Sequence, residues 1–165
     1  MPIELTPEEV LAWTGLLRTS STLTRRLDLE LRREHGLSIS EWEVLFLLGR
    51  AAGGRARMSE LAQETLLSQG GITHLVGRLE RGGLASKEPD ADDRRVHRVA
   101  LTEEGRVRLE DATRTHFAGV REQFSRRFSE EELSLLAGFW ERLLPSHAET
   151  AFGRSGDPRE TTGRP

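Results

Sequence analysis

The stretch "PDADDRRVHRVALTEEG", residues 89–105, determines how the rest of the chain is interpreted. It begins with a proline and a dense run of acids and arginines, and then becomes an alternating apolar pattern that ends at Thr102. Proline and aspartate favour turns, alternation predicts a strand, and a threonine before two acids is typical of a helix N-cap. We therefore expect two strands, residues 84–88 and 97–101, joined by a charged loop and followed by a long helix.

Three short helical patterns precede this hairpin, each with a serine as the expected N-cap. Ser40 precedes "EWEVLFLLGRA", Ser59 precedes "ELAQETL", and Ser68 precedes "QGGITHLVGRLERGG". Serine hydroxyls accept hydrogen bonds from the free amides of a first helical turn. The glycine pair Gly82–Gly83 is expected to end the third helix. The segment "ARM", residues 56–58, is long enough for an edge strand at most.

Longer amphipathic patterns occupy both ends of the chain. Thr6 is expected to cap a helix that runs to about His35, with apolar residues at helical spacing over about seven turns. Thr102 is expected to cap a helix that reaches about Arg127, and a further helix follows Ser129. Helices of this length exceed what one small core can cover, which indicates packing against a second subunit.

The order of these elements predicts a mainly α fold with a small β-hairpin wing. It combines a winged helix-turn-helix domain with a helical dimerisation domain. Residues 37–102 form the expected DNA-binding domain, and residues 1–36 and 103–145 form the dimerisation region. Residues 146–165 are poor in core-forming side chains, which predicts a disordered C-terminal tail.

The composition limits the classes of function. The chain has 165 residues and a net charge of −3, so nucleic-acid binding would need a local basic patch. It has no cysteine, and none of its five histidines forms the i, i+4 pair of a helical metal site. No nucleophile elbow, phosphate loop or membrane-spanning apolar run is present, and we expect no signal peptide. We expect a cytoplasmic protein that is not an enzyme and that uses no cofactor or metal.

Three segments resemble the MarR family of bacterial transcription regulators. "LSISEWEVLFLL" is similar to the helix before the DNA-binding motif, and "LLSQGGITHLVGRLERGGL" is similar to the recognition helix. "DADDRRVHRVALTEEG" is similar to the wing and the start of the next helix, with the Asp-x-Arg pattern of the family at residues 93–95. The resemblance covers roughly residues 6–145. It implies a homodimer that binds double-stranded DNA.

The recognition helix has one apolar stripe and one small, polar face. Such a face suits a major groove about 12 Å wide, and its glycines would be costly on a merely solvated helix, by roughly 1 kcal/mol each. Many family members carry arginine and aspartate where this chain has His74 and Gly77. The alternative interpretation of this polar face is an ordinary solvent-exposed helix surface that contacts no DNA. We expect major-groove contacts from Ser68, Gln69, Gly70, Thr73, His74 and Arg78.

The wing is expected to enter the minor groove. Arginine is attracted there because the negative potential is enhanced in a narrow groove. Arg94 and Arg95 form the expected tip, and Asp93 is expected to orient Arg95 through a carboxylate–guanidinium pair. The alternative is a charged hairpin that contacts only water.

The family resemblance also implies a small-molecule effector, often an aromatic acid or a phenol, that releases the DNA. The candidate lining residues are Trp13, Arg18 and Trp42, because tryptophan can stack on a ring and arginine can pair with a carboxylate. Both tryptophans also fit a purely structural place in the core. The predicted function is a repressor that binds a pseudo-palindromic operator with half-sites roughly 10 base pairs apart. The alternative function is a dimeric protein-interaction module that does not bind DNA.

The wing assignment generates a prediction. Arg95→Ala should weaken binding to all DNA sequences and reduce the slope of log affinity against log salt by about one unit, because one phosphate contact is lost. A salt titration of DNA binding measures this slope. An unchanged slope would place the wing away from the DNA.

Overall fold

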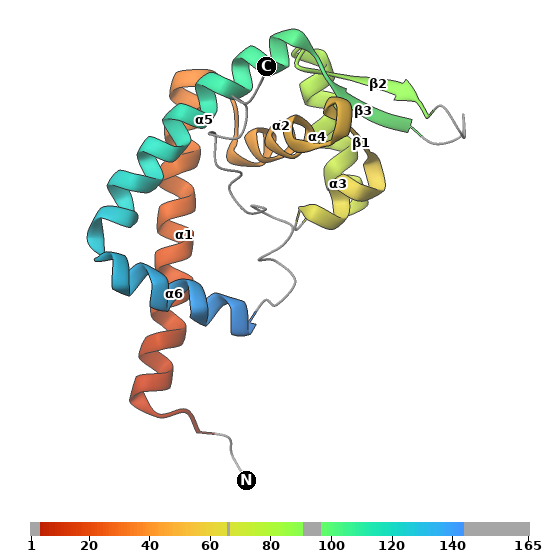
Figure 1. Cartoon of the computed structure of the whole chain (residues 1–165). Helices are drawn as coiled ribbons and strands as arrows, with labels where there is room; N and C mark the ends of the chain where they lie inside the picture. The colour runs from red at the N-terminus through yellow and green to blue at the C-terminus, as the bar shows by residue number, and fades with distance from the viewer. Residues whose placement is uncertain (1–3, 66, 91–96, 144–165) are drawn as a thin grey trace, which may run out of the picture. The chain divides into compact units, whose positions relative to one another are not determined.

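The computed structural model describes residues 4–65, 67–90 and 97–143 (Figure 1). They form two compact units, one that runs to Arg127 and a second that begins at Phe128. Each unit is described by itself. None of the described helices is long and apolar enough to cross a membrane.

The described residues of the first unit form five α-helices and a small sheet. Its helices are α1 (Pro7–His35), α2 (Ile39–Arg50), α3 (Met58–Glu64), α4 (Gln69–Arg81) and α5 (Glu103–Gln123). Its strands are β1 (Arg55–Arg57), β2 (Ala85–Pro89) and β3 (His97–Leu101), in the antiparallel order β1-β3-β2. Short 3-10 turns lie at η1 (Ala52–Gly54) and η2 (Ser125–Arg127). In the second unit the described helix is α6 (Glu130–Leu143). The predicted fold class, mainly α with a hairpin wing, is confirmed.

Four of the expected helix starts are confirmed by their side-chain caps. In each, a hydroxyl accepts a hydrogen bond from the amide three residues later, at 2.9 to 3.2 Å. The capping residues are Thr6, Ser68, Thr102 and Ser129. These signals are local, so the sequence alone reveals them.

Two expected caps were wrong. The N-cap of α2 is Ser38, paired with Glu41, so Ser40 lies inside the helix. Helix α3 begins at Met58, where the Arg57 amide donates to the Glu60 carboxylate at 2.7 Å, so Ser59 also lies inside its helix.

The end of the long helix after Thr102 was also placed too late. Helix α5 ends at Gln123 rather than at about Arg127. Phe124 has φ −124° and ψ −69°, outside the helical region, and the 3-10 turn η2 follows it.

The apolar stripe of α4 enters the core as predicted. Its members are all buried and pack with the buried face of α2 and with Val99 of β3. Burying each such aliphatic side chain contributes roughly 1.5–3 kcal/mol. This packing fixes which face of α4 points away from the core. The stripe consists of Ile72, Leu75, Val76 and Leu79.

The end of α4 is joined to the start of α5. Just after α4, Gly83 has a φ of +72°, a conformation that does not continue the helix. Its carbonyl oxygen accepts a hydrogen bond from the Thr102 hydroxyl at 2.7 Å. At Gly105, a Cβ atom would lie 2.0 Å from the Leu84 carbonyl oxygen. No side chain fits at that distance, so glycine is required for α5 to pack against Leu84, in the turn between α4 and β2.

Helices α1 and α5 lie side by side along the first unit (Figure 1). A Cβ atom at Gly119 would lie 2.7 Å from Leu27, which shows how closely the two helices approach. Toward the N-terminus, α1 instead exposes a series of apolar side chains: Val10, Leu11, Trp13 and Leu17.

One buried carboxylate holds the three strands at the base of the wing. Asp90, directly after β2, is 1% exposed. Its Oδ2 atom accepts from Arg57 Nε of β1 at 3.1 Å and from Arg98 Nε of β3 at 2.6 Å. Arg57 and Arg98 are opposite each other in the sheet register, so the carboxylate links the paired strands β1 and β3. We call this contact the clasp.

This clasp generates a prediction about stability. Asp90→Ala should lower the free energy of unfolding by roughly 2–4 kcal/mol, because two arginines lose the carboxylate that neutralises them. The loss should be below that of a fully buried triad, since both arginines reach solvent. Urea unfolding at fixed protein concentration measures it. The control is Glu88→Ala, which removes a surface pair with Arg55 at 3.5 Å and should cost less than about 1 kcal/mol. Equal losses would contradict the prediction.

Candidate nucleic-acid interface

The face of α4 that points away from the core is small and polar. Ser68, Gly70, Thr73 and His74 are exposed, and Gln69 is the first residue of the helix. The structure thus brings five of the six predicted major-groove residues to the first part of α4, next to its N-terminus. The free amides there carry partial positive charge, which suits a phosphate.

The glycines of this face are not required by the fold. A Cβ atom at Gly70 would meet nothing within 4 Å, and one at Gly77 would meet only Arg81 Nη1, at 3.7 Å. Glycine in a helix interior costs roughly 1 kcal/mol relative to alanine. The chain therefore keeps a shallow outer surface that its own packing does not need, which favours close approach by a partner.

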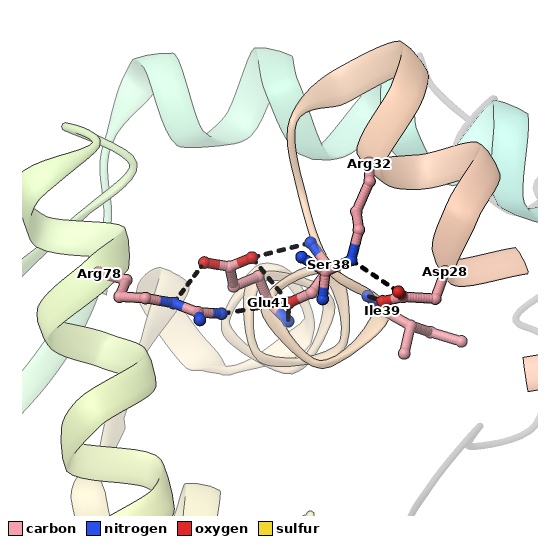
Figure 2. Close-up of polar contacts among 6 residues, drawn as sticks. All are labelled: Asp28, Arg32, Ser38, Ile39, Glu41 and Arg78. Carbon is pink, nitrogen blue, oxygen red and sulfur yellow. Dashed lines mark hydrogen bonds and ion pairs between the residues drawn. The ribbon is translucent and has the colours of Figure 1, made fainter. Parts of the chain in front are cut away.

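Arg78, the sixth predicted groove residue, lies against α2 (Figure 2). Its Nε atom is 3.0 Å from Glu41 Oε1, and its Nη2 atom donates to Ser38 Oγ at 3.4 Å. No local pattern in the sequence predicts this contact, because 37 residues separate Arg78 from Glu41.

The other partners of this contact lie at the N-terminus of α2. Glu41 Oε2 accepts from the Ser38 amide at 2.8 Å and from the Ser38 hydroxyl at 2.7 Å. Asp28 of α1 accepts from the Ile39 amide at 2.9 Å and from Arg32 Nε at 2.6 Å. Figure 2 shows these six residues as one polar cluster that connects α1, α2 and α4. Sequence reasoning missed Asp28 and Glu41.

The predicted wing residues Asp93, Arg94 and Arg95 lie outside the described residues. Their roles therefore stay predictions. The two strands that carry the loop are described, and Asp90 fixes their base.

A hollow of about 450 Å³ lies between α2 and α5. It combines aromatic and aliphatic walls with three arginines, and the Arg50 guanidinium lies 5.7 Å from the centre of the Phe46 ring. Such a lining suits a flat organic anion. The lining residues are Phe46, Gly49, Arg50, Arg106, Leu109, Glu110, Thr113 and Arg114.

The three predicted effector residues are not gathered around this hollow. Trp13 and Arg18 are exposed on α1, and neither lines it. Trp42 is buried in the core, and its Nε1 atom donates to Thr113, which does line the hollow, at 3.1 Å.

A histidine that the sequence did not single out lies beside Trp42. The ring centres of Trp42 and His116 are 3.9 Å apart. Among the described residues, His116 Nδ1 has no hydrogen-bond partner. Burial lowers the pKa of His116, so its imidazole is neutral near pH 7 and can accept or donate a hydrogen bond.

Within the described ranges, no group of three histidines or acids lies where it could hold a metal ion.

Comparisons with known proteins agree with this geometry. The model of the MarR family matches residues 35–96. The HTH-type transcriptional repressor YetL of Bacillus subtilis (strain 168) is 32% identical over 111 residues, which cover 66% of this chain and 66% of YetL. The HTH-type transcriptional regulator MhqR of the same organism is 33% identical over 110 residues, 67% of this chain and 74% of MhqR.

Among solved structures, the chain is similar to Sco3205 of Streptomyces coelicolor, a MarR family transcriptional regulator crystallised in complex with DNA. The identity is 30% and the TM-score is 0.82, and the match covers 92% of this chain and 97% of Sco3205. On its winged helix-turn-helix fold, its family match and these relatives, the chain belongs to the MarR family of transcriptional regulators.

Proposed function

We propose that the protein is a transcriptional repressor that binds a pseudo-palindromic operator as a homodimer and is released by a small ligand. The observation that carries this is the exposed polar face of α4, which the fold keeps shallow without needing it for packing. The DNA complex of Sco3205 supports the DNA-binding role, and the name of YetL supports repression. Such a regulator would act in the cytoplasm.

In this proposal, α4 occupies the major groove and the loop after β2 reaches the minor groove. Ser68, Gln69, Gly70, Thr73 and His74 contact base edges and nearby phosphates. Arg94 and Arg95 enter the minor groove at the wing, and Asp93 orients Arg95. Because the net charge of the chain is −3, these local groups supply the attraction to DNA.

The dimer is proposed from apolar surface that each unit leaves exposed. In the first unit this surface lies on the N-terminal half of α1, and in the second it includes Leu135 and Phe139 of α6. Exposed apolar patches of this kind mark protein contacts. Residues 1–36 and 103–145 would form the dimerisation region, and residues 37–102 would bind DNA.

The effector is proposed to be a small aromatic acid in the hollow between α2 and α5. Arg50, Arg106 and Arg114 could pair with its carboxylate, and Phe46 could contact its ring. It would favour a conformation in which the two recognition helices no longer match the operator. Trp13 and Arg18 stay sequence-based predictions for this role.

The competing proposal is a dimeric protein-interaction module without DNA binding. The acidic net charge favours it. The relatives are named as transcriptional regulators rather than enzymes, which supports a non-enzymatic role under either proposal.

The DNA-binding proposal predicts opposite effects of one substitution on stability and on binding. Gly70→Leu should raise the free energy of unfolding by a few tenths of a kcal/mol or more, because leucine is a better helix former and the site is open. It should also weaken binding at least tenfold, because the side chain projects into the groove. Fluorescence anisotropy with duplexes from the DNA flanking its own gene measures binding.

The matched control is Gly70→Ala, which adds only one methyl group and should weaken binding less than Gly70→Leu, because it fills less of the open space on the outer face of α4. Wild-type protein that binds no duplex would support the protein-interaction module instead. Unchanged DNA binding by the Gly70→Leu variant would show that this face of α4 does not lie in the major groove.

If α6 contributes to the dimer interface, a charge on its apolar face should convert dimers to monomers and so lower the measured mass of the protein. Phe139→Glu should convert much of the protein to monomer at micromolar concentration, because an unpaired carboxylate would be buried in the interface. Sedimentation equilibrium measures the mass. Ala137→Glu, an exposed position about 200° around the helix, should leave the dimer intact. A Phe139→Glu variant that stays dimeric would exclude this face of α6 from the dimer interface.

A further inference from the structure

We propose that Arg78 is a positioning residue: it fixes the orientation of α4 by binding Glu41 at the N-terminus of α2, and it does not read the DNA. The inference rests on the proposed DNA-binding function and deepens it. It changes the role of the one strongly basic residue among the six predicted for the recognition helix.

The guanidinium of Arg78 is held by two partners at once. Its Nε atom is 3.0 Å from Glu41 Oε1 and its Nη2 atom is 3.4 Å from Ser38 Oγ. Only 39% of the Arg78 side chain is exposed. The planar guanidinium has a fixed donor geometry, so two contacts define its direction as well as its distance. That direction is toward α2.

The Glu41 carboxylate is held in place by contacts that do not involve Arg78. One carboxylate oxygen, Oε2, accepts from both the amide and the hydroxyl of Ser38 at the start of α2. The other oxygen, Oε1, is left for Arg78. The Glu41 side chain is only 12% exposed, so its attraction to Arg78 is less screened than that of a surface pair. The carboxylate therefore acts as a rigid anchor.

The anchor is connected in turn to α1. Asp28 accepts from the Ile39 amide at 2.9 Å, in the same first turn of α2, and its other oxygen pairs with Arg32 at 2.6 Å. Figure 2 shows the chain of contacts from α1 through the start of α2 to α4. Residues 1–36 are those proposed to carry dimer contacts. The tilt of the recognition helix is thus set relative to the dimerisation helix.

A positioning residue and a DNA-contacting residue predict different results in a double-mutant cycle. The variants are Arg78→Gln, Glu41→Gln and the double variant. Glutamine at position 41 keeps an acceptor for the Ser38 amide, as in a normal capping box, but loses the charge that holds Arg78. Binding is measured by anisotropy on the operator duplex and on a scrambled duplex, each over a salt series.

We expect both single variants to lose about tenfold in affinity for the operator and little for the scrambled duplex. The double variant should be no weaker than the weaker single variant, because all three break the same link. The salt slope should stay unchanged, because no phosphate contact is removed. Arg78→Lys should behave like Arg78→Gln, since lysine keeps the charge but lacks the planar guanidinium.

The matched control is Glu60→Gln, which alters a glutamate with the same capping role at α3 and should leave operator binding unchanged. Thermal unfolding of each variant identifies any that fails to fold. Should Glu41→Gln leave operator affinity unchanged or raise it, the inference is overturned. A salt slope that falls by about one unit in Arg78→Gln overturns it as well, because Arg78 would then contact a phosphate. Absence of DNA binding by the wild-type protein would overturn the proposed function itself.

Discussion

The first turn of α2 contains backbone amides that have no hydrogen-bond partner within the helix. The side chains that satisfy these amides also connect α2 to α1 and α4. Such unpaired amides are a cost at every helix start. Here one is satisfied by the Ser38 hydroxyl and another by Asp28 of α1. In the reciprocal hydrogen bond, the Ser38 amide donates to Glu41, and this bond fixes a carboxylate whose second oxygen faces Arg78 of α4. A local capping requirement thereby becomes a contact among three helices that are far apart in the sequence.

The same use of acids reduces the positive charge that the protein can present to DNA. The net charge is −3, Asp90 neutralises charge on Arg57 and Arg98, and Glu41 neutralises Arg78. Electrostatic attraction to phosphates provides most non-specific binding. A surface with little such charge favours recognition by shape and by base contacts, which suits the shallow outer face of α4.

Features encoded by neighbouring residues were predictable, and features decided by distant partners were not. The amphipathic helices, the apolar stripe of α4 and four of the caps follow from local spacing. At α2 we expected Ser40 to be the cap, whereas the helix is capped by Ser38, and the Ile39 amide beside it donates to Asp28 of the preceding helix. Asp90 resembled an ordinary turn acid, because its partners Arg57 and Arg98 come together only when β1 pairs with β3. The groove contacts and the wing remain predictions that DNA-binding measurements can test.

The junction at Thr102 has a mechanical consequence. The Thr102 hydroxyl bonds to the carbonyl of Gly83, and α5 starts there with no room for a side chain at Gly105, so the end of α4 and the start of α5 are rigidly joined. Helix α5 is 21 residues long, which makes it a rod of about 30 Å. A rotation of about 5° about one end of such a rod moves the other end by about 3 Å, close to the spacing of one base pair along DNA. A small tilt of α5 about its far end, near Gln123, would therefore displace the end of α4 that is joined to it by about the length of one base-pair step.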